Sequence, residues 1–332
     1  MVETTITDVQ WDGIIEEIHL GGCVPFLGAA VNVSREGYEG LPLGRDVAIH
    51  LLKAMLKLKQ EELDSLVKDE KDILEKVKVY ERLANSPRYK DLTQAQFYNL
   101  ARVALHVQLE LNDEKSFLRL LKSIIAEEEC KPSLILNTLA QLPFKLIITT
   151  NYDQLMEKAL DLHNRAYKII SQPKDGFSPK DKKKIDDKLR EYDGLTLYKI
   201  HGTFSIRDKL SYISGSTASP QVIITEDDYI SYLTVIGAKD RGMPDEVKAQ
   251  IARNPLLFLG YGLEDWDFRT IFKSIIEPLP KNDKRHSFAI QKNPSEFWIK
   301  FWDKKNVSIC DFDLYVFIAE LERRYKEYVA KL

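Results

Sequence analysis

The sequence predicts an α/β fold in which a parallel sheet is flanked by helices, and three observations lead to this prediction. Short apolar runs, typical of strands that are buried on both faces, recur along the chain. Helical patterns separate several of these runs, and strands that alternate with helices form parallel βαβ units. Small or polar residues follow four of the runs, at the strand ends where open α/β sheets bind ligands.

The expected strands and helices alternate from the first apolar run to the end of the chain. The strand-like runs occupy residues 23–27, 145–150, 195–200, 222–225, 255–260, 287–290 and 307–310. Helical patterns lie between several of them, at 152–163 and 265–276, and a charged helical segment at 314–332 ends the chain. This order predicts a Rossmann-like, doubly wound sheet. We expect the final helix to pack on its own domain, and packing on a neighbouring subunit is the alternative.

A long helical stretch separates the first expected strand from the second. Apolar residues at positions 51, 52, 55 and 56 form the stripe of an amphipathic helix, and similar stripes continue to about residue 125. We therefore expect a single domain over residues 1–332 with a mostly helical insertion at 43–128. The charge-rich segment at 174–191 predicts a surface loop or a short exposed helix. A nucleic-acid-binding patch is the alternative, which its aspartates weaken.

Composition limits the classes of protein to which the chain can belong. Its 48 basic and 51 acidic side chains give a formal charge of -3, which favours neither nucleic acid nor an anionic membrane as partner. No apolar run reaches the ~18 residues of a membrane span, and the acidic N-terminus is unlike a signal peptide. Cys23, Cys130 and Cys310 form no CxxC pair, so we expect a reduced, cytoplasmic protein without a four-cysteine zinc site.

Small residues follow the first strand and end a later one. Gly28, Ala29 and Ala30 let backbone N–H groups approach a pyrophosphate, although a tight structural turn explains the same residues. Of the dinucleotide fingerprint G-x-G-x-x-G, only the first glycine is present. Gly260 and Gly262 end the strand at 255–260, where they either admit an adenosine ribose or form a turn before a capped helix.

Polar residues follow two further strands. Thr150 ends the strand-like run at 145–150, Asn151 and Asp153 follow it, and His201 follows the next run. Asn or Asp commonly caps a helix, so we expect one of Asn151 and Asp153 to do so; in the alternative interpretation both bind a ribose or an amide. Histidine exchanges protons near neutral pH, which makes His201 a candidate base, although a structural histidine is the simpler interpretation.

The order of these motifs resembles that of the sirtuin superfamily. There a first strand ends in a GAG-type loop, a later strand ends in T-x-N-x-D, a histidine–glycine pair supplies the base, and a glycine-containing strand end contacts the adenosine of NAD. This chain has GAA at 28–30, TTNYD at 149–153, HG at 201–202 and GYG at 260–262. The resemblance covers roughly residues 24–267 and implies a sirtuin-like NAD-binding fold.

Two departures narrow this resemblance. Three dispersed cysteines cannot build the zinc module of protein-deacylating sirtuins, and Ala30 stands where the family pattern has its second glycine. The chain resembles instead the sirtuin-like domains of bacterial antiphage defence, which hydrolyse NAD. These work as oligomers or with a sensing partner, such as a DNA-translocating ATPase or an Argonaute-type protein. Because the chain has no obvious room for a large sensor, we expect a homo-oligomer or a separately encoded partner, with NAD as substrate, no metal and no membrane.

The resemblance also implies a role for individual residues in cleaving NAD to nicotinamide and ADP-ribose. Asn151 would orient the attacking water or the ribose, and His201 would act as a base on a ribose hydroxyl or on the water. The residues implied to bind NAD are Gly28, Ala29, Ala30, Thr150, Asp153, Gly260 and Gly262.

Three other functions compete with NAD hydrolysis. The main alternative is a non-catalytic module that senses NAD or ADP-ribose and regulates a partner, although a pure sensor needs no base such as His201. A lysine deacylase or ADP-ribosyltransferase is disfavoured because the zinc cysteines are missing. A P-loop nucleotidase is disfavoured because no GK[ST] follows a glycine-rich turn.

Overall fold

The chain divides into two compact units. The computed structural model describes residues 6–56, 99–125, 130–204, 213, 221–236, 238–263, 269, 272–277 and 285–332. The first unit contains Met1–Gly40, Cys130–Ile223 and Ile230–Leu332, and the second contains Leu41–Glu129 and Ile224–Tyr229. One boundary between them falls within helix α11 (Glu226–Ile236).

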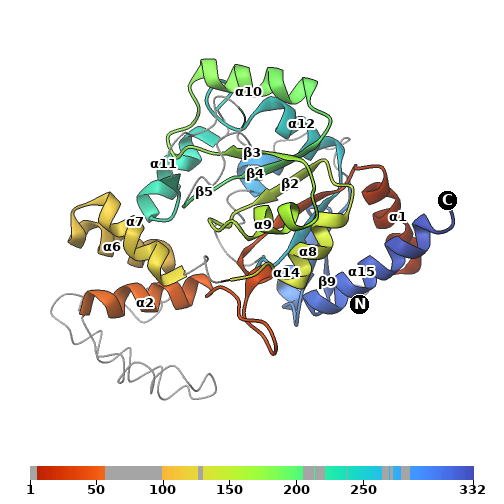
Figure 1. The fold of residues 1–332 in the computed structure, drawn as a ribbon, viewed down its shortest axis with the longest axis horizontal. Coiled ribbons are helices and arrows are strands. Elements are labelled where there is room, and N and C mark those ends of the chain that lie inside the picture. Colours follow the sequence, from red (N-terminus) through yellow and green to blue (C-terminus); the bar gives the residue numbers. More distant parts are fainter. Residues whose placement is uncertain are drawn as a thin grey trace. The chain divides into compact units, whose positions relative to one another are not determined.

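A seven-stranded parallel sheet forms the centre of the first unit (Figure 1). Its strands are β1 (Val24–Leu27), β2 (Leu146–Thr149), β3 (Tyr167–Ser171), β4 (Leu195–Lys199), β7 (Leu256–Leu259), β8 (Ser287–Gln291) and β9 (Val307–Asp311). They lie in the order β3-β4-β2-β1-β7-β8-β9, and every neighbouring pair is parallel. The central strands β1, β2, β4 and β7 are buried along their whole length. The predicted Rossmann-like α/β fold is confirmed.

Helices cover both faces of this sheet (Figure 1). One layer consists of α1 (Asp8–His19), α8 (Leu134–Gln141), α9 (Leu155–Leu162) and α15 (Leu314–Val329), in which α8 contacts α9 and α15, and α15 contacts α1. The other contains α10 (Pro179–Glu191), α12 (Asp245–Arg253), the π-helix η3 (Phe272–Ile276) and α14 (Glu296–Asp303). Two layers of this kind follow from right-handed crossovers on either side of β1. The final helix packs on its own unit, as expected, with Phe317, Ile318 and Leu321 buried.

The second unit is helical where the structure describes it. Its helices α2 (Gly44–Leu56), α6 (Leu100–Leu111) and α7 (Glu114–Ile125) pack against one another. Phe117, Leu121 and Ile125 form the buried stripe of α7 at four-residue spacing, as an amphipathic helix requires. Residues 57–98 and 126–129 of the expected insertion at 43–128 lie outside the described residues. The division into one NAD-binding domain with this insertion stays a prediction.

The run at 222–225 does not belong to the main sheet, contrary to the sequence prediction. Only Gln221–Val222 is extended, as β6, and it pairs antiparallel with β5 (Gly202–Thr203) in a separate two-stranded sheet. Thr225 and Asp228 exchange side chain–backbone hydrogen bonds of 3.1 Å in both directions. This reciprocal capping starts α11 and ends the extended stretch.

The charge-rich segment at 174–191 contains the 13-residue helix α10, which starts at the side-chain cap of Ser178. The helical alternative of its prediction is therefore confirmed, although Lys182, Ile185, Asp186 and Leu189 are buried rather than exposed. The expected helix at 265–276 is described only at residue 269 and in η3, so the expected cap at Asp265 lies outside the described residues.

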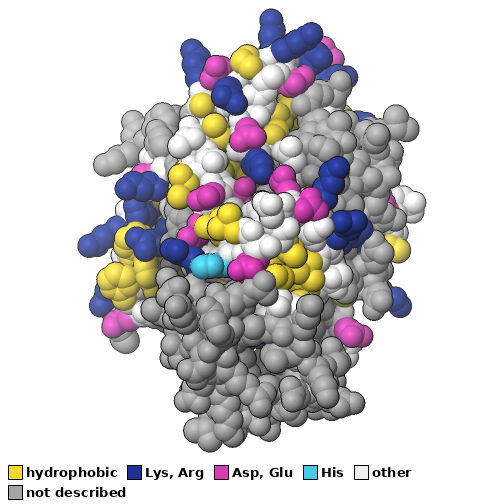
Figure 2. Space-filling view, turned by 90° about the vertical axis from the view of Figure 1, so that its left-hand side faces the viewer, with side chains coloured by type: hydrophobic (Ala, Val, Ile, Leu, Met, Phe, Trp, Pro, Cys, Tyr) yellow, Lys and Arg dark blue, Asp and Glu magenta, His cyan; other side chains and the backbone are white. Residues whose placement is uncertain are grey.

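On the face shown in Figure 2, Lys and Arg side chains are interspersed with Asp and Glu, so its described part has no extended basic surface.

Among the described helices, none combines the length and the apolar character that crossing a bilayer requires.

Candidate functional site

The four loops that the sequence singles out leave four adjacent strands. Gly28 follows β1, Thr150 follows β2, His201 comes two residues after β4, and Gly260 follows β7. The spatial order β4-β2-β1-β7 makes these strands neighbours, and all four run in the same direction. The structure therefore brings the predicted site residues together at the carboxyl edge of the sheet.

The register of the strands places these loops at one level. Leu27 pairs with Thr149 on one side and with Leu259 on the other, and Thr149 pairs with Lys199. After β1, the chain adds β2, β3 and β4 on one side of β1. It then adds β7, β8 and β9 on the opposite side. Such a reversal of strand order is the topological switch point at which doubly wound sheets bind their ligands.

Gly28 and Gly260 pack backbone against backbone at this switch point. A Cβ atom on Gly28 would lie 2.5 Å from the carbonyl oxygen of Gly260, and one on Gly260 would lie 2.7 Å from the backbone nitrogen of Val31. Gly260 also has a φ of +78°, in the left-handed region that favours glycine. Close approach of the loops after β1 and β7 therefore requires both glycines, whatever ligand the loops bind.

The turn after β1 is a short 3-10 helix, η1 (Ala29–Asn32), and most of its N–H groups have internal partners. The N–H groups of Gly28, Ala30 and Val31 donate to the carbonyls of Leu259, Gly260 and Gly28. Ala29 is exposed, and its N–H forms no hydrogen bond with described residues. Of the three residues predicted to cradle a pyrophosphate, Ala29 is the one with an available N–H.

Asn151 connects the loop after β2 with the turn after β1. Its backbone N–H donates to the side chain of Thr149 at 3.0 Å, and its Nδ2 donates to the carbonyl of Gly28 at 3.1 Å. Its Oδ1 accepts no hydrogen bond from the described residues. The side chain is half-buried, so this oxygen can accept a hydrogen bond from a ligand or a water.

Thr150 and Tyr261 join the loops after β2 and β7 across β1. The hydroxyl of Tyr261 donates to Oγ1 of Thr150 at 2.7 Å, and its ring lies 5.5 Å from that of Phe26 in β1. Tyr261 stands between Gly260 and the half-buried Gly262, and it is not among the predicted site residues. An aromatic residue between two glycines at a strand end was the available signal.

Asp153 is buried behind this loop, and the expected helix cap at Asn151 or Asp153 is not found, because the N-cap of α9 is Gln154, which forms no side-chain cap hydrogen bond. The Oδ1 of Asp153 accepts from the N–H of Leu155, the first residue of α9, at 2.9 Å and from Nδ2 of Asn32 at 3.4 Å. The pKa of Asp153 is raised by burial, against the opposing effect of the Lys199 charge. Asn32 is itself buried, and its Oδ1 has no hydrogen-bond partner in the described part of the chain. The structure thus adds Asn32, which ends the small-residue turn in the sequence.

A buried ion pair next to Asp153 is formed by two residues that are not among the predicted site residues. Nζ of Lys199 lies 2.8 Å from Oε1 of Glu157 and also donates to the backbone carbonyl of Asp153. A lysine that ends an otherwise apolar strand was a signal for Lys199. Nothing local marks Glu157, which is 42 residues away along the chain.

His201 lies in an aromatic environment at the end of β4. It is 3 % exposed, with the ring of Tyr232 edge-on at 5.7 Å and that of Tyr152 stacked at 6.5 Å. The adjacent Gly202 has a φ of +81°, and a Cβ there would overlap the carbonyl oxygen of Gln221. Burial lowers the pKa of His201 to about 3, so the imidazole is neutral at physiological pH.

The buried imidazole predicts a pH-dependent stability. In the unfolded chain His201 binds a proton below pH ~6.5, whereas in the folded chain it stays neutral down to about pH 3. Its contribution to the free energy of unfolding is therefore fully present above pH ~6.5 and falls by up to ~1.4 kcal/mol per pH unit below it. Urea unfolding at pH 7 and pH 5 should show that the parent loses about 2 kcal/mol more than His201→Gln. Equal losses in the two proteins would contradict this burial.

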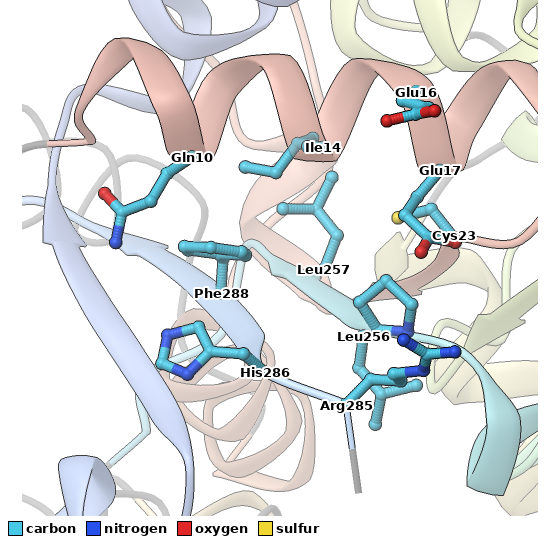
Figure 3. A pocket seen from close by; sticks show the side chains of 12 residues that line it. Gln10, Ile14, Glu16, Glu17, Cys23, Leu256, Leu257, Arg285, His286 and Phe288 are labelled. Atoms are coloured by element: carbon cyan, nitrogen blue, oxygen red, sulfur yellow. The ribbon is translucent and has the colours of Figure 1, made fainter.

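A cavity of about 450 Å³ lies at the opposite edge of the sheet, between α1 and the amino ends of β7 and β8. Figure 3 shows Gln10, Ile14 and Glu17 on the side of α1, with Arg285 and His286 across from them. Parallel α/β sheets bind ligands at their carboxyl edge, so we do not assign the site to this cavity.

Among the described residues, no group of three or more His, Cys, Asp or Glu side chains could hold a metal ion.

Comparison with known proteins places residues 145–310, half of the chain, in the SIR2-like domain family. The chain is 23% identical to Defense-associated sirtuin 2 of Bacillus subtilis over 240 residues, which are 70% of this chain and 20% of that protein. It is 28% identical to NAD(+) hydrolase ThsA of Acinetobacter baumannii (strain 532279) over 160 residues, which are 46% of this chain and 27% of that protein. The chain thus spans less than a third of the length of either relative.

Proposed function

The chain belongs to the SIR2-like domain family, and on this basis we propose that it is an NAD hydrolase of antiphage defence. It would bind NAD across the carboxyl edge of the sheet and cleave the bond between nicotinamide and ribose. The convergence of four loops on the adjacent strands β4, β2, β1 and β7 is the observation that carries this proposal. The names of the two relatives, a defense-associated sirtuin and an NAD(+) hydrolase, support the substrate and the setting.

The charge of the substrate explains how these residues could act. The nicotinamide ring of NAD is positive, and as its bond to ribose breaks, that charge moves to an oxocarbenium-like sugar. A carboxylate on Asp153 would stabilise this charge, and the open Oδ1 of Asn151 would orient the attacking water or a ribose hydroxyl. The neutral imidazole of His201 would polarise a hydroxyl or water as an acceptor, since a pKa of about 3 disfavours storing a proton.

The proposal also includes the cellular compartment of the protein and the assembly in which it works. None of the three cysteines Cys23, Cys130 and Cys310, all of which the structure describes, forms a disulfide bond, which suits the reducing cytoplasm. We propose that the protein works as a homo-oligomer or with a separately encoded defence partner, such as a DNA-translocating ATPase or an Argonaute-type protein. Both relatives are much longer than their matched segments, which is compatible with functions outside this domain.

Product analysis after incubation with NAD tests the proposed activity. We expect nicotinamide and ADP-ribose to appear in equal amounts, from the chain alone or together with the product of a neighbouring gene. An acetyl-lysine peptide added to the same reaction should stay unmodified. Saturable binding of NAD without any product would support the sensing module instead, and the absence of both binding and product would refute the proposal.

A further inference from the structure

The side chain of Lys199 connects the end of β4 with the loop after β2 at the carboxyl edge of the sheet. Its side chain is completely buried, with 0% of its surface exposed, at the last position of β4. Its ammonium group donates to the backbone carbonyl of Asp153, in the loop after β2, and to the carboxylate of Glu157, in the first turn of α9. The strand that leads to His201 is thereby tied to the loop that carries Asp153.

The charges in this buried group do not balance. One ammonium pairs with the carboxylate of Glu157, which is 3% exposed, and contacts Asp153, which is 7% exposed, at its backbone carbonyl while its charge also acts on the Asp153 carboxyl group. Oε2 of Glu157 is buried and has no hydrogen-bond partner among the residues that the structure describes. Burial raises the pKa of both carboxyl groups, and the charge of Lys199 opposes the rise in each. The two carboxylates therefore compete for the same cation.

Stability alone does not account for an ion pair at this position. Removing two charges from water costs free energy that their attraction repays only in part, and apolar residues of similar size are often as stable or more stable. The surroundings of Lys199 and Glu157 would accept apolar side chains, since Leu197 of β4 and Leu155 of α9 are both fully buried. A charged pair in this core suggests a role beyond packing.

We propose that Lys199 is a positioning residue, which fixes the Asp153 loop against the end of β4 and keeps the Asp153 carboxyl group charged for the substrate. In this arrangement Glu157 determines how much of the Lys199 charge acts on Asp153. The inference rests on the proposed function only for the identity of the substrate, a dinucleotide with a positive ring. A carboxylate held in this way would meet the charge that develops on the ribose.

The other groups that face Asp153 do not provide this charge. Asn32 of η1 and the first N–H of α9 donate to its Oδ1, and neither of them titrates. Among the described residues, Tyr38, in the loop after η1, is a further titratable group that interacts with Asp153, and burial first and then interactions with Tyr315, Cys130 and Asp153 raise its pKa. It therefore stays neutral near pH 7. Lys199 and Glu157 are the charged groups whose removal should change Asp153.

The pKa of Asp153 can be read directly by carboxyl ¹³C NMR of the full chain, with the signal assigned through Asp153→Asn. Lys199→Met removes the cation and should raise this pKa by about one pH unit or more. Glu157→Gln removes the competing carboxylate and should lower it. A pair that only supports the fold predicts no such opposite shifts.

A double variant separates positioning from stability. Lys199→Met alone should lower the melting temperature by roughly 10 °C, because it leaves Glu157 without its partner. Lys199→Met/Glu157→Met should regain most of this loss while the pKa of Asp153 stays raised. In the double variant, the acid limb of kcat/KM for NAD cleavage should therefore lie at higher pH than in the parent. In Glu157→Gln, it should lie at lower pH than in the parent.

Lys182 offers a matched control in the same unit. It is 4% exposed and pairs with Asp186 at 3.2 Å within α10. Lys182→Met should lower the melting temperature without moving the pKa of Asp153 or the acid limb. Comparison with this variant shows whether the effect of Lys199 is specific to the site.

Two results would overturn the inference. One is a pKa of Asp153 that is unchanged in both Lys199→Met and Glu157→Gln, or that shifts in the same direction in both. The other is a double variant with the acid limb of the parent. The NMR titration requires no turnover, so a parent that cleaves no NAD would refute the proposed function while the titration still decides the role of Lys199.

Discussion

Replacing Asn151 or His201 by alanine is expected to slow nicotinamide release by about 10²–10⁴-fold, while NAD binding persists. Asn151→Ala removes the open Oδ1 and the hydrogen bond from Nδ2 to Gly28. His201→Ala removes the acceptor for a ribose hydroxyl or water. Rates at saturating NAD, together with a binding titration, separate the loss of chemistry from the loss of affinity.

Matched controls exist for both substitutions. Asn137 also donates Nδ2 to backbone carbonyls, of Pro132 and Ser133, but it lies in α8. His286 is exposed and lines the cavity at the opposite edge of the sheet. Asn137→Ala and His286→Ala should cleave NAD at the rate of the parent. If Asn151→Ala and His201→Ala are as fast as these controls and remain folded, the assignment of the site is wrong.

Gly260→Ala should strongly destabilise the first unit and weaken NAD binding. The left-handed backbone costs alanine ~1 kcal/mol relative to glycine. Its Cβ would also lie 2.7 Å from the nitrogen and 2.9 Å from Cγ1 of Val31, so the turn after β1 would have to move. Overpacking of this kind adds ~1–3 kcal/mol, for a total loss of about 2–4 kcal/mol in the free energy of unfolding.

Gly37 separates the steric part of this effect from the backbone part. It has a φ of +75°, and a Cβ on it would meet nothing within 4 Å. Gly37→Ala should therefore cost only the backbone term of ~1 kcal/mol and leave NAD binding unchanged. Chemical denaturation of the two variants measures the difference, and equal losses would show that the contact between Gly260 and Val31 relaxes without cost.

Much of the fold could be predicted because buried parallel strands are continuous apolar runs. This signal identifies β1, β2, β4, β7, β8 and β9. Strand β3 lies at the edge of the sheet, and only its last three residues are buried, so its apolar run is too short to stand out. At 222–225 the apolar run is genuine, but the capping of α11 by Thr225 and Asp228 overrides it.

The candidate site could be predicted in part, since small and polar residues at strand ends are visible in a sequence. Their convergence depends on the strand order, which places β4 beside β2 and β7 beside β1. The partners that hold the site could not be found in this way. Asn32 and Asp153 are 121 residues apart, and Lys199 and Glu157 meet only through the packing of α9 on the sheet.

The position of NAD in a crystal structure of the Asn151→Ala variant is the most direct test of whether the carboxyl edge of the sheet is the site. We expect the dinucleotide to cross the ends of β1 and β7 beside Gly28 and Gly260, with its nicotinamide ribose next to Asp153 and His201. NAD bound between α1 and the amino ends of β7 and β8, or anywhere away from the four loops, would contradict this assignment.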